Sequence, residues 1–179
     1  MRCTAHTINL VVKSVLYGVN VDCVEDTVLS DDPLESVSSF EPALRTADEQ
    51  SQLQAWRKKG PTGKLHNLIV HNSSSPSRRH YFELTQREAG DKRIYKAIVN
   101  EGVRWNSACD MIELAVNLRD ALEEYQEQYR EGVGALANDD RLAPCDWLEL
   151  TELQSVLLLL KKMSLRMQSE ATDGHNGAL

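Results

Sequence analysis

Cys3 and His6 stand in a Cys-x-x-His spacing, which is one of the spacings at which zinc fingers present their ligands. A structural zinc site needs four ligands, usually as two such pairs. The other close pair is His66 and His71, and on a helix residues five apart point about 140° away from each other. We therefore predict no metal site in this chain.

Side chains suited to nucleophilic or acid–base catalysis are present, but their spacing predicts no active site. A catalytic cysteine needs a base and an oxyanion site, yet the sequence contains no nucleophile elbow and no glycine-rich phosphate loop. The acids form runs such as Glu123-Glu124 and Glu127, which are typical of a solvated helix face. No active site is predicted from this chain alone.

The strongest chemical signal is a basic stretch over residues 58–93. Lys and Arg neutralise DNA phosphates and release counterions, which gives an affinity that is independent of base sequence. The alternative is a solvated basic surface that pairs with the acidic residues 20–50, and charge alone leaves both interpretations open. The stretch contains the cations Lys58, Lys59, Lys64, Arg78, Arg79, Arg87, Lys92 and Arg93, with His66, His71 and His80 between them.

The net charge of the chain is −7, from 20 Lys+Arg against 27 Asp+Glu, whereas a free-standing nucleic-acid binder is expected to be basic. This charge is unevenly distributed. Residues 20–50 carry nine acids against Arg45, and residues 51–93 carry nine bases against three acids. Outside residues 20–50 the chain sums to +1, so its composition does not exclude DNA contact.

Arg104 and Trp105 are a second candidate for nucleic-acid contact. A tryptophan at the entrance of a helix is usually a packing residue. The alternative is an aromatic platform for an unstacked base, with the arginine on a phosphate, and such stacking is worth roughly 1–3 kcal/mol per base.

Apolar side chains at helical spacing dominate the elements that must position these residues. After Ser107 and Asp110, which resemble a capping box, the spacing predicts one helix of about six turns that ends near Tyr129. Pro144 with Asp146 predicts the start of the last helix. Further helices are predicted over residues 4–18, 47–58 and 62–72 and from 76 to about 87.

These elements predict an all-α fold, an irregular helical bundle without strands. Residues 1–19 are expected to form a helix, and the acidic, serine-rich residues 20–50 a disordered loop. Residues 51–179 are expected to form one helical domain. The longest apolar run, Val156–Leu160, is far shorter than the roughly 20 residues that a membrane helix needs, so we expect no membrane partner. Four cysteines without a framework spacing and no cleavage site near the first residues predict a soluble intracellular protein.

Six segments resemble motifs of the hAT family of DNA transposases, in particular of its fungal-type members. Each motif is short, and their common order over nearly the whole chain carries the resemblance. The segments are Arg2–Leu10, Gly60–Asn67, Ser75–Arg79 with Phe82, Arg104–Ser107 with 111–113 and 118–120, Asp140–Pro144 with Asp146, Trp147 and Leu150, and Ala171–Leu179.

The resemblance implies an RNase H-like transposase in which two Asp and one Glu hold Mg²⁺ or Mn²⁺ for strand cleavage and transfer. It implies that this chain covers part of the helical insertion domain and lacks those three acids, the BED-type zinc finger and the C-terminal dimerisation region. Cys3 and His6 are then a family motif, and no cofactor is expected in this chain. The implied partners are DNA at transposon ends and another copy of the chain, and the implied location is the nucleus.

Arg104 and Trp105 match the family position by position. In the family this tryptophan stabilises a flipped base beside the cleavage site, and its ring offsets a few kcal/mol of lost base stacking. Val103 and Ala143 depart from the pattern, since members usually have Thr at both positions. Loss of the Thr at the helix N-cap costs about 1 kcal/mol, and such departures are typical of a truncated or decaying copy.

We therefore expect a truncated hAT-type transposase remnant that is inactive alone. One alternative is a helical module that binds protein, and another is a chain whose severed apolar face prevents stable folding. The residues predicted to contact DNA are Arg104, Trp105, Lys58, Lys59, Lys64, Arg78 and Arg79.

Overall fold

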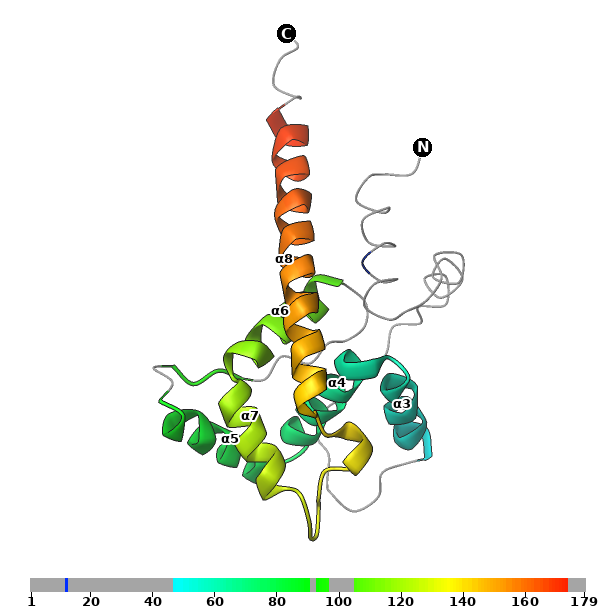
Figure 1. Cartoon of the computed structure of the whole chain (residues 1–179), viewed down its shortest axis with the longest axis vertical. Coiled ribbons are helices and arrows are strands. Elements are labelled where there is room, and N and C mark those ends of the chain that lie inside the picture. Colours follow the sequence, from blue (N-terminus) through cyan, green and yellow to red (C-terminus); the bar gives the residue numbers. More distant parts are fainter. Residues whose placement is uncertain (1–11, 13–46, 91–92, 97–104, 174–179) are drawn as a thin grey trace.

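The computed structural model describes Val12 and residues 47–90, 93–96 and 105–173, and every regular element in these ranges is helical (Figure 1). The all-α prediction is therefore confirmed for this part of the chain. Residues 47–50 of the segment predicted as an acidic loop form the first turn of a helix. The elements are α3 (Ala47–Arg57), α4 (Gly60–Ser73), α5 (Pro76–Glu88), α6 (Trp105–Asn117), α7 (Arg119–Gln128), the 3-10 helix η1 (Asn138–Asp140) and α8 (Pro144–Asp173).

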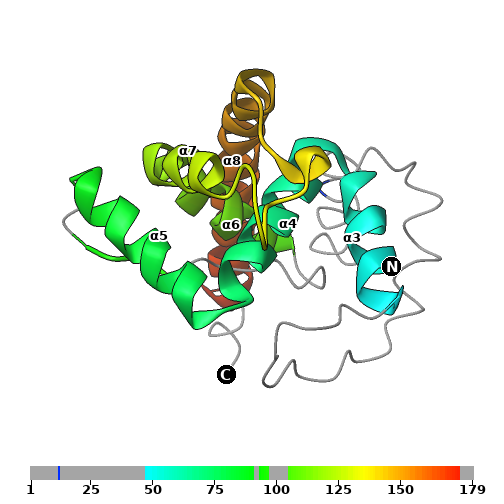
Figure 2. The ribbon, with the colours of Figure 1, turned by 90° about the horizontal axis from the view of Figure 1, so that it is seen from below.

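α4 lies in the middle of the fold, and α3 and α5 pack on opposite sides of it (Figure 2). It also contacts α6, α8 and η1, while α7 packs on α5 and α6 packs on α8. The helices cross at different angles, as expected for an irregular bundle (Figure 1). The largest core side chains include Leu65, Leu68, Met111, Ile112, Leu122, Tyr125, Trp147, Leu150 and Leu157.

The region predicted as one helix of six turns is divided at Leu118, so that prediction is wrong in its continuity. Leu118 has φ −102° and ψ 24° and separates α6 from α7. Its amide still donates to the Leu114 carbonyl at 3.0 Å, and its carbonyl accepts from Leu122 at 3.0 Å. The break has a packing reason, since α6 packs on α8 whereas α7 packs on α5, and one straight helix would not follow both.

The predicted apolar stripe of this region is nevertheless confirmed. Met111, Ala115, Leu118, Leu122 and Tyr125 are all buried in the core. The predicted start was wrong, because α6 begins at Trp105, which places Ser107 inside the helix rather than at its N-cap.

α8 begins at Pro144, as predicted, and Ala143 precedes it in the N-cap position. The methyl side chain of Ala143 cannot accept a hydrogen bond from the first turn of α8, but the other half of a capping box is present. Asp146, three residues on, accepts from the Ala143 amide at 2.7 Å. In the described part of the chain, none of the helices is both long and apolar enough to cross a membrane.

Two glycines explain how closely α3 and α4 approach. Gly60 has φ +64° and turns the chain between the two helices, a conformation that costs other residues roughly 1–2 kcal/mol. Gly63 lies against α3, where a Cβ atom would stand 1.7 Å from the Trp56 carbonyl oxygen. Because Gly63 has no side chain, α4 can approach the end of α3 this closely.

Replacing Gly63 by alanine should destabilise the fold, although alanine is the better helix former by about 1 kcal/mol. The new Cβ would collide with backbone and push α3 away from α4. We expect a net loss of about 1–3 kcal/mol in the free energy of unfolding, the usual cost of an overpacked site. Urea denaturation followed by circular dichroism measures it.

Gly132→Ala is the control, since Gly132 has φ +97° with open space around it and tests only the cost of the backbone conformation. A Gly63→Ala variant as stable as the wild type, or more stable, would contradict the close approach.

Candidate nucleic-acid interface

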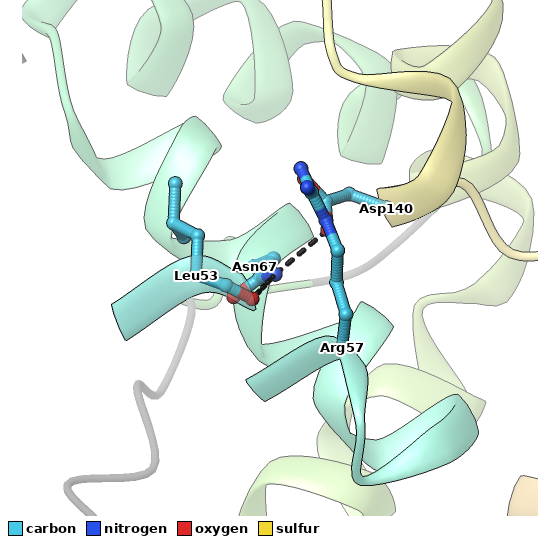
Figure 3. A network of polar contacts seen from close by, with 4 residues as sticks. All are labelled: Leu53, Arg57, Asn67 and Asp140. Atoms are coloured by element: carbon cyan, nitrogen blue, oxygen red, sulfur yellow. Dashed lines mark hydrogen bonds and ion pairs between the residues drawn. The ribbon is translucent and has the colours of Figure 1, made fainter. Parts of the chain in front are cut away.

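Asp140 is a buried carboxylate, 3% exposed, that joins η1 to α3 and α4 (Figure 3). Arg57 holds both of its oxygens, with Nε 2.7 Å from Oδ1 and Nη2 2.6 Å from Oδ2. The Asn67 amide donates to Asp140 Oδ1 at 2.7 Å and to the Leu53 carbonyl at 3.0 Å. The hydrogen bond to Asp140 raises the pKa of the Arg57 guanidinium, so Arg57 carries its positive charge at neutral pH.

Asp146 forms a second junction between α8 and α4. Its Oδ2 lies 2.8 Å from Lys64 Nζ and also accepts from the Ala143 amide. The Asp146 side chain is 9% exposed, so the ammonium of Lys64 forms an ion pair with a poorly solvated carboxylate. Lys64, a predicted DNA contact, therefore has an internal partner.

The two histidines of α4 point into different surroundings, as their spacing predicted. His66 stacks on Trp56 of α3 with the ring centroids 3.8 Å apart, and Lys59 Nζ lies 3.6 Å from the Trp56 ring centroid. His71 is buried between the Tyr125 hydroxyl, at 2.8 Å from Nδ1, and the Gly134 carbonyl, at 2.9 Å from Nε2.

A carbonyl only accepts hydrogen bonds, so His71 donates from Nε2 to the Gly134 carbonyl, and in the neutral imidazole its Nδ1 accepts from the Tyr125 hydroxyl. Burial raises the pKa of Tyr125, which keeps this hydroxyl protonated as a donor. His71 therefore joins α4 to α7 and to the loop before α8.

The Ser-Pro-Ser-Arg-Arg segment forms the junction between α4 and α5. Ser75 is the N-cap of α5 and accepts from the Arg78 amide at 3.2 Å. The Arg78 guanidinium donates to the Ser74 hydroxyl and, at 2.8 Å, to the Gly134 carbonyl. Arg79 donates to the Ser73 carbonyl at 2.6 Å. Both guanidiniums thus lie at the C-terminal end of α4, where the helix dipole favours positive charge.

The structure therefore divides the predicted DNA-binding residues into groups. Lys64 and Arg78 make partly buried internal contacts, and Lys59 covers Trp56. Lys58 and Arg79 are exposed, as are the neighbouring cations Arg87 and Arg93.

Arg104, Cys3 and His6 lie outside the described residues, and Trp105 is the first residue of α6. The described residues hold no group of three His, Cys, Asp or Glu side chains that could bind a metal ion. Whether any of the predicted residues contacts DNA stays a prediction.

Sequence reasoning missed the internal role of the basic stretch. Lys64 of the stretch pairs with Asp146, and Arg57, which immediately precedes the stretch, pairs with Asp140. Arg57 is not among the residues predicted to contact DNA. Its guanidinium donates one hydrogen bond to each oxygen of Asp140, which is the more specific geometry of the two ion pairs. One signal in the sequence could have indicated these contacts. Asp140 and Asp146 belong to one of the segments that resemble the hAT family, and Lys64 and Asn67 belong to another.

Comparison with family models gives one finding. The model of the ZBED1 RNase-like helical domain matches residues 1–153. All the quoted motifs except Ala171–Leu179 lie within this range. A comparison with curated proteins found no match, and neither did a comparison with solved structures.

Asp140→Asn should destabilise the fold by about 3 kcal/mol, in the range found when one partner of a buried ion pair is removed. The new amide would direct a donor group towards the donors of Arg57 or Asn67 and leave the guanidinium without its counter-charge. Chemical denaturation of the purified chain measures the change.

The neighbouring exposed residue provides a matched control. Asp139→Asn makes the same chemical change and should alter stability by no more than about 0.5 kcal/mol. Equal stabilities of the two variants would show that the Asp140 junction does not hold the fold together.

Proposed function

The chain belongs to the ZBED1 RNase-like helical domain family, a hAT-related group of transposase-derived domains, and we propose that it is the DNA-contacting helical domain of a hAT-type transposase remnant. The observation that carries the proposal is the separation of the basic residues into two classes. Cations with internal acid partners fix the fold, whereas Lys58, Arg79, Arg87 and Arg93 present their charge to solvent.

The exposed cations are spaced along the body of the domain. Lys58 precedes α4 and Arg79 follows it, so the 14 residues of α4, about 20 Å of helix, separate them. Arg87 lies two turns further along α5. A duplex carries phosphates along its whole length, so cations spread over such a distance suit contact with its backbone rather than with one base.

Arg104 and Trp105 complete the proposal at the start of α6. By analogy with the hAT family, Trp105 stacks on an unpaired base and Arg104 contacts a phosphate. We also propose fungal-type hAT ancestry, a nuclear location and, for the parent protein, strand cleavage and transfer with Mg²⁺ or Mn²⁺. The described residues offer no cluster fit for such an ion, so no step of that chemistry is assigned to them.

A helical module that binds protein is the second candidate function. It rests on apolar side chains that α8 leaves exposed, among them Leu148 and Leu159. The two functions differ in their dependence on salt, because apolar contacts do not release counterions whereas phosphate contacts do.

The triple variant Lys58→Ala, Arg79→Ala, Arg87→Ala should bind a random-sequence DNA duplex more weakly and with less dependence on salt. The slope of log K against log salt is negative, and each lost phosphate contact makes it less steep by about 0.9. We expect a total change of about 2 to 3, measured by fluorescence anisotropy of a labelled duplex over a range of salt concentrations.

The control is Arg119→Ala, Arg130→Ala, Arg141→Ala, which removes three cations that pair with Glu123 or Glu127 on the surface. This variant has the same net charge as the first. DNA affinities that fall equally in the two variants, or that do not depend on salt, would contradict the proposed contact surface.

Trp105→Ala should weaken binding to a duplex with one unpaired base but not to a fully paired duplex. Loss of one stacking partner is worth roughly 1–3 kcal/mol, or about 5- to 150-fold in affinity. Competition binding with the two duplexes measures the ratio. Trp105→Phe, which keeps an aromatic ring, should recover most of the difference, and a loss that is equal on both duplexes would contradict stacking.

A further inference from the structure

Residues 132–134, which we call the glycine turn, lie between α7 and η1 and are held to α4 and α5 through one carbonyl. Gly132 and Gly134 have φ +97° and +79°. The Gly134 carbonyl accepts from His71 Nε2 of α4 at 2.9 Å and from the Arg78 guanidinium of α5 at 2.8 Å. These two side chains therefore hold the glycine turn against the body of the domain.

His71 fits its two hydrogen-bond partners as a neutral imidazole. Its ring is buried, with 3% of the residue exposed, and while Nε2 donates to the glycine turn, Nδ1 accepts from the Tyr125 hydroxyl at 2.8 Å. Tyr125 is fully buried, and burial raises the pKa of its hydroxyl, which keeps its proton at neutral and acidic pH. The ring nitrogen that would take up a further proton is thus the one that already accepts a hydrogen bond.

We propose that His71 is an acid-sensitive latch, which holds the glycine turn while the imidazole is neutral and releases it when the imidazole takes up a proton. A proton on Nδ1 makes both ring nitrogens donors, so the Tyr125 hydroxyl would have to become the acceptor. Its own proton would then turn into the protein interior, and a buried donor that loses its acceptor lowers stability.

The charges around His71 also oppose a second proton on its ring. Arg78 donates to the same carbonyl oxygen, so an imidazolium would stand beside a guanidinium. The dipole of α4 favours positive charge at this end of the helix, but Arg78 and Arg79 already lie there. The acids Glu88 and Glu124 of the flanking helices are exposed, so water screens their charge. The other titratable side chains packed around the ring are Tyr81 of α5 and Tyr125 and Tyr129 of α7.

The latch gives the fold a pH dependence of defined sign. An unfolded histidine binds a proton at about pH 6.5, whereas the folded state keeps His71 neutral. The unfolded state therefore binds more protons, and stability falls as the pH drops below about 6.5. Between about pH 7.5 and 5.5, the equilibrium constant for unfolding should rise about tenfold more in the wild type than in His71→Gln. Urea denaturation of the whole chain at the two pH values measures it.

Glutamine is chosen because its amide offers a donor and an acceptor but does not titrate. His80→Gln is the matched control, since His80 is an exposed histidine of α5, and this variant should keep the wild-type pH dependence. An equal pH dependence of the wild type and His71→Gln would overturn the proposal. Ring nitrogen chemical shifts test the wild type directly, and a folded chain with a protonated His71 ring at about pH 6 would overturn it as well.

Hydrogen exchange of the Leu136 amide tests whether the glycine turn is the part released. This amide follows the turn and donates to the Tyr129 carbonyl at 2.9 Å. Between about pH 7.5 and 5.5 its protection factor should fall about tenfold in the wild type and stay constant in His71→Gln. It should also stay below that of Leu150, a fully buried residue of α8. Equal protection of the two amides would overturn the latch, because the turn would then open only when the whole fold does.

Discussion

Two carboxylates hold the first described helices to the last one. Asp140 joins Arg57 of α3 and Asn67 of α4, and Asp146 joins Lys64 of α4 to the start of α8. Both acids lie within seven residues of chain, Asp140 in η1 and Asp146 in the first turn of α8. The helix that both acids hold, α4, also contacts α5 and α6.

Buried ion pairs add little net stability when compared with well-packed apolar residues, because both charges lose their hydration. Their value here is geometric. The planar guanidinium of Arg57 faces both oxygens of Asp140, and Asn67 fixes the same carboxylate from α4, which permits one relative placement of three elements. A purely apolar contact between α3 and η1 would not select an orientation so narrowly.

The helices could be predicted from the sequence where local signals define them. Pro76 after Ser75 and Pro144 after Ala143 mark helix starts, and the apolar spacing around Leu65, Leu68 and Ile69 marks a buried face. The break at Leu118 could not be predicted, because it arises from two different packing partners far away in the sequence. The apolar stripe continues across it unchanged.

The site could be predicted only in part, for a related reason. A count of bases gives the total charge of residues 51–93 but not what each side chain faces. Lys64 and Lys58 have the same charge in the sequence, yet one has a buried acid beside it and the other is exposed. That difference depends on Asp146, which lies 82 residues away from Lys64.

The same sequence separation has a consequence for the order of folding. Arg57 and Lys64 are 83 and 82 residues away from the acids that they contact, so a long loop must close before either pair forms. During synthesis α3 and α4 leave the ribosome long before Asp140 and Asp146 do. The charged groups of Arg57 and Lys64 therefore lack these carboxylates until the start of α8 emerges, so both junctions form only when this segment docks.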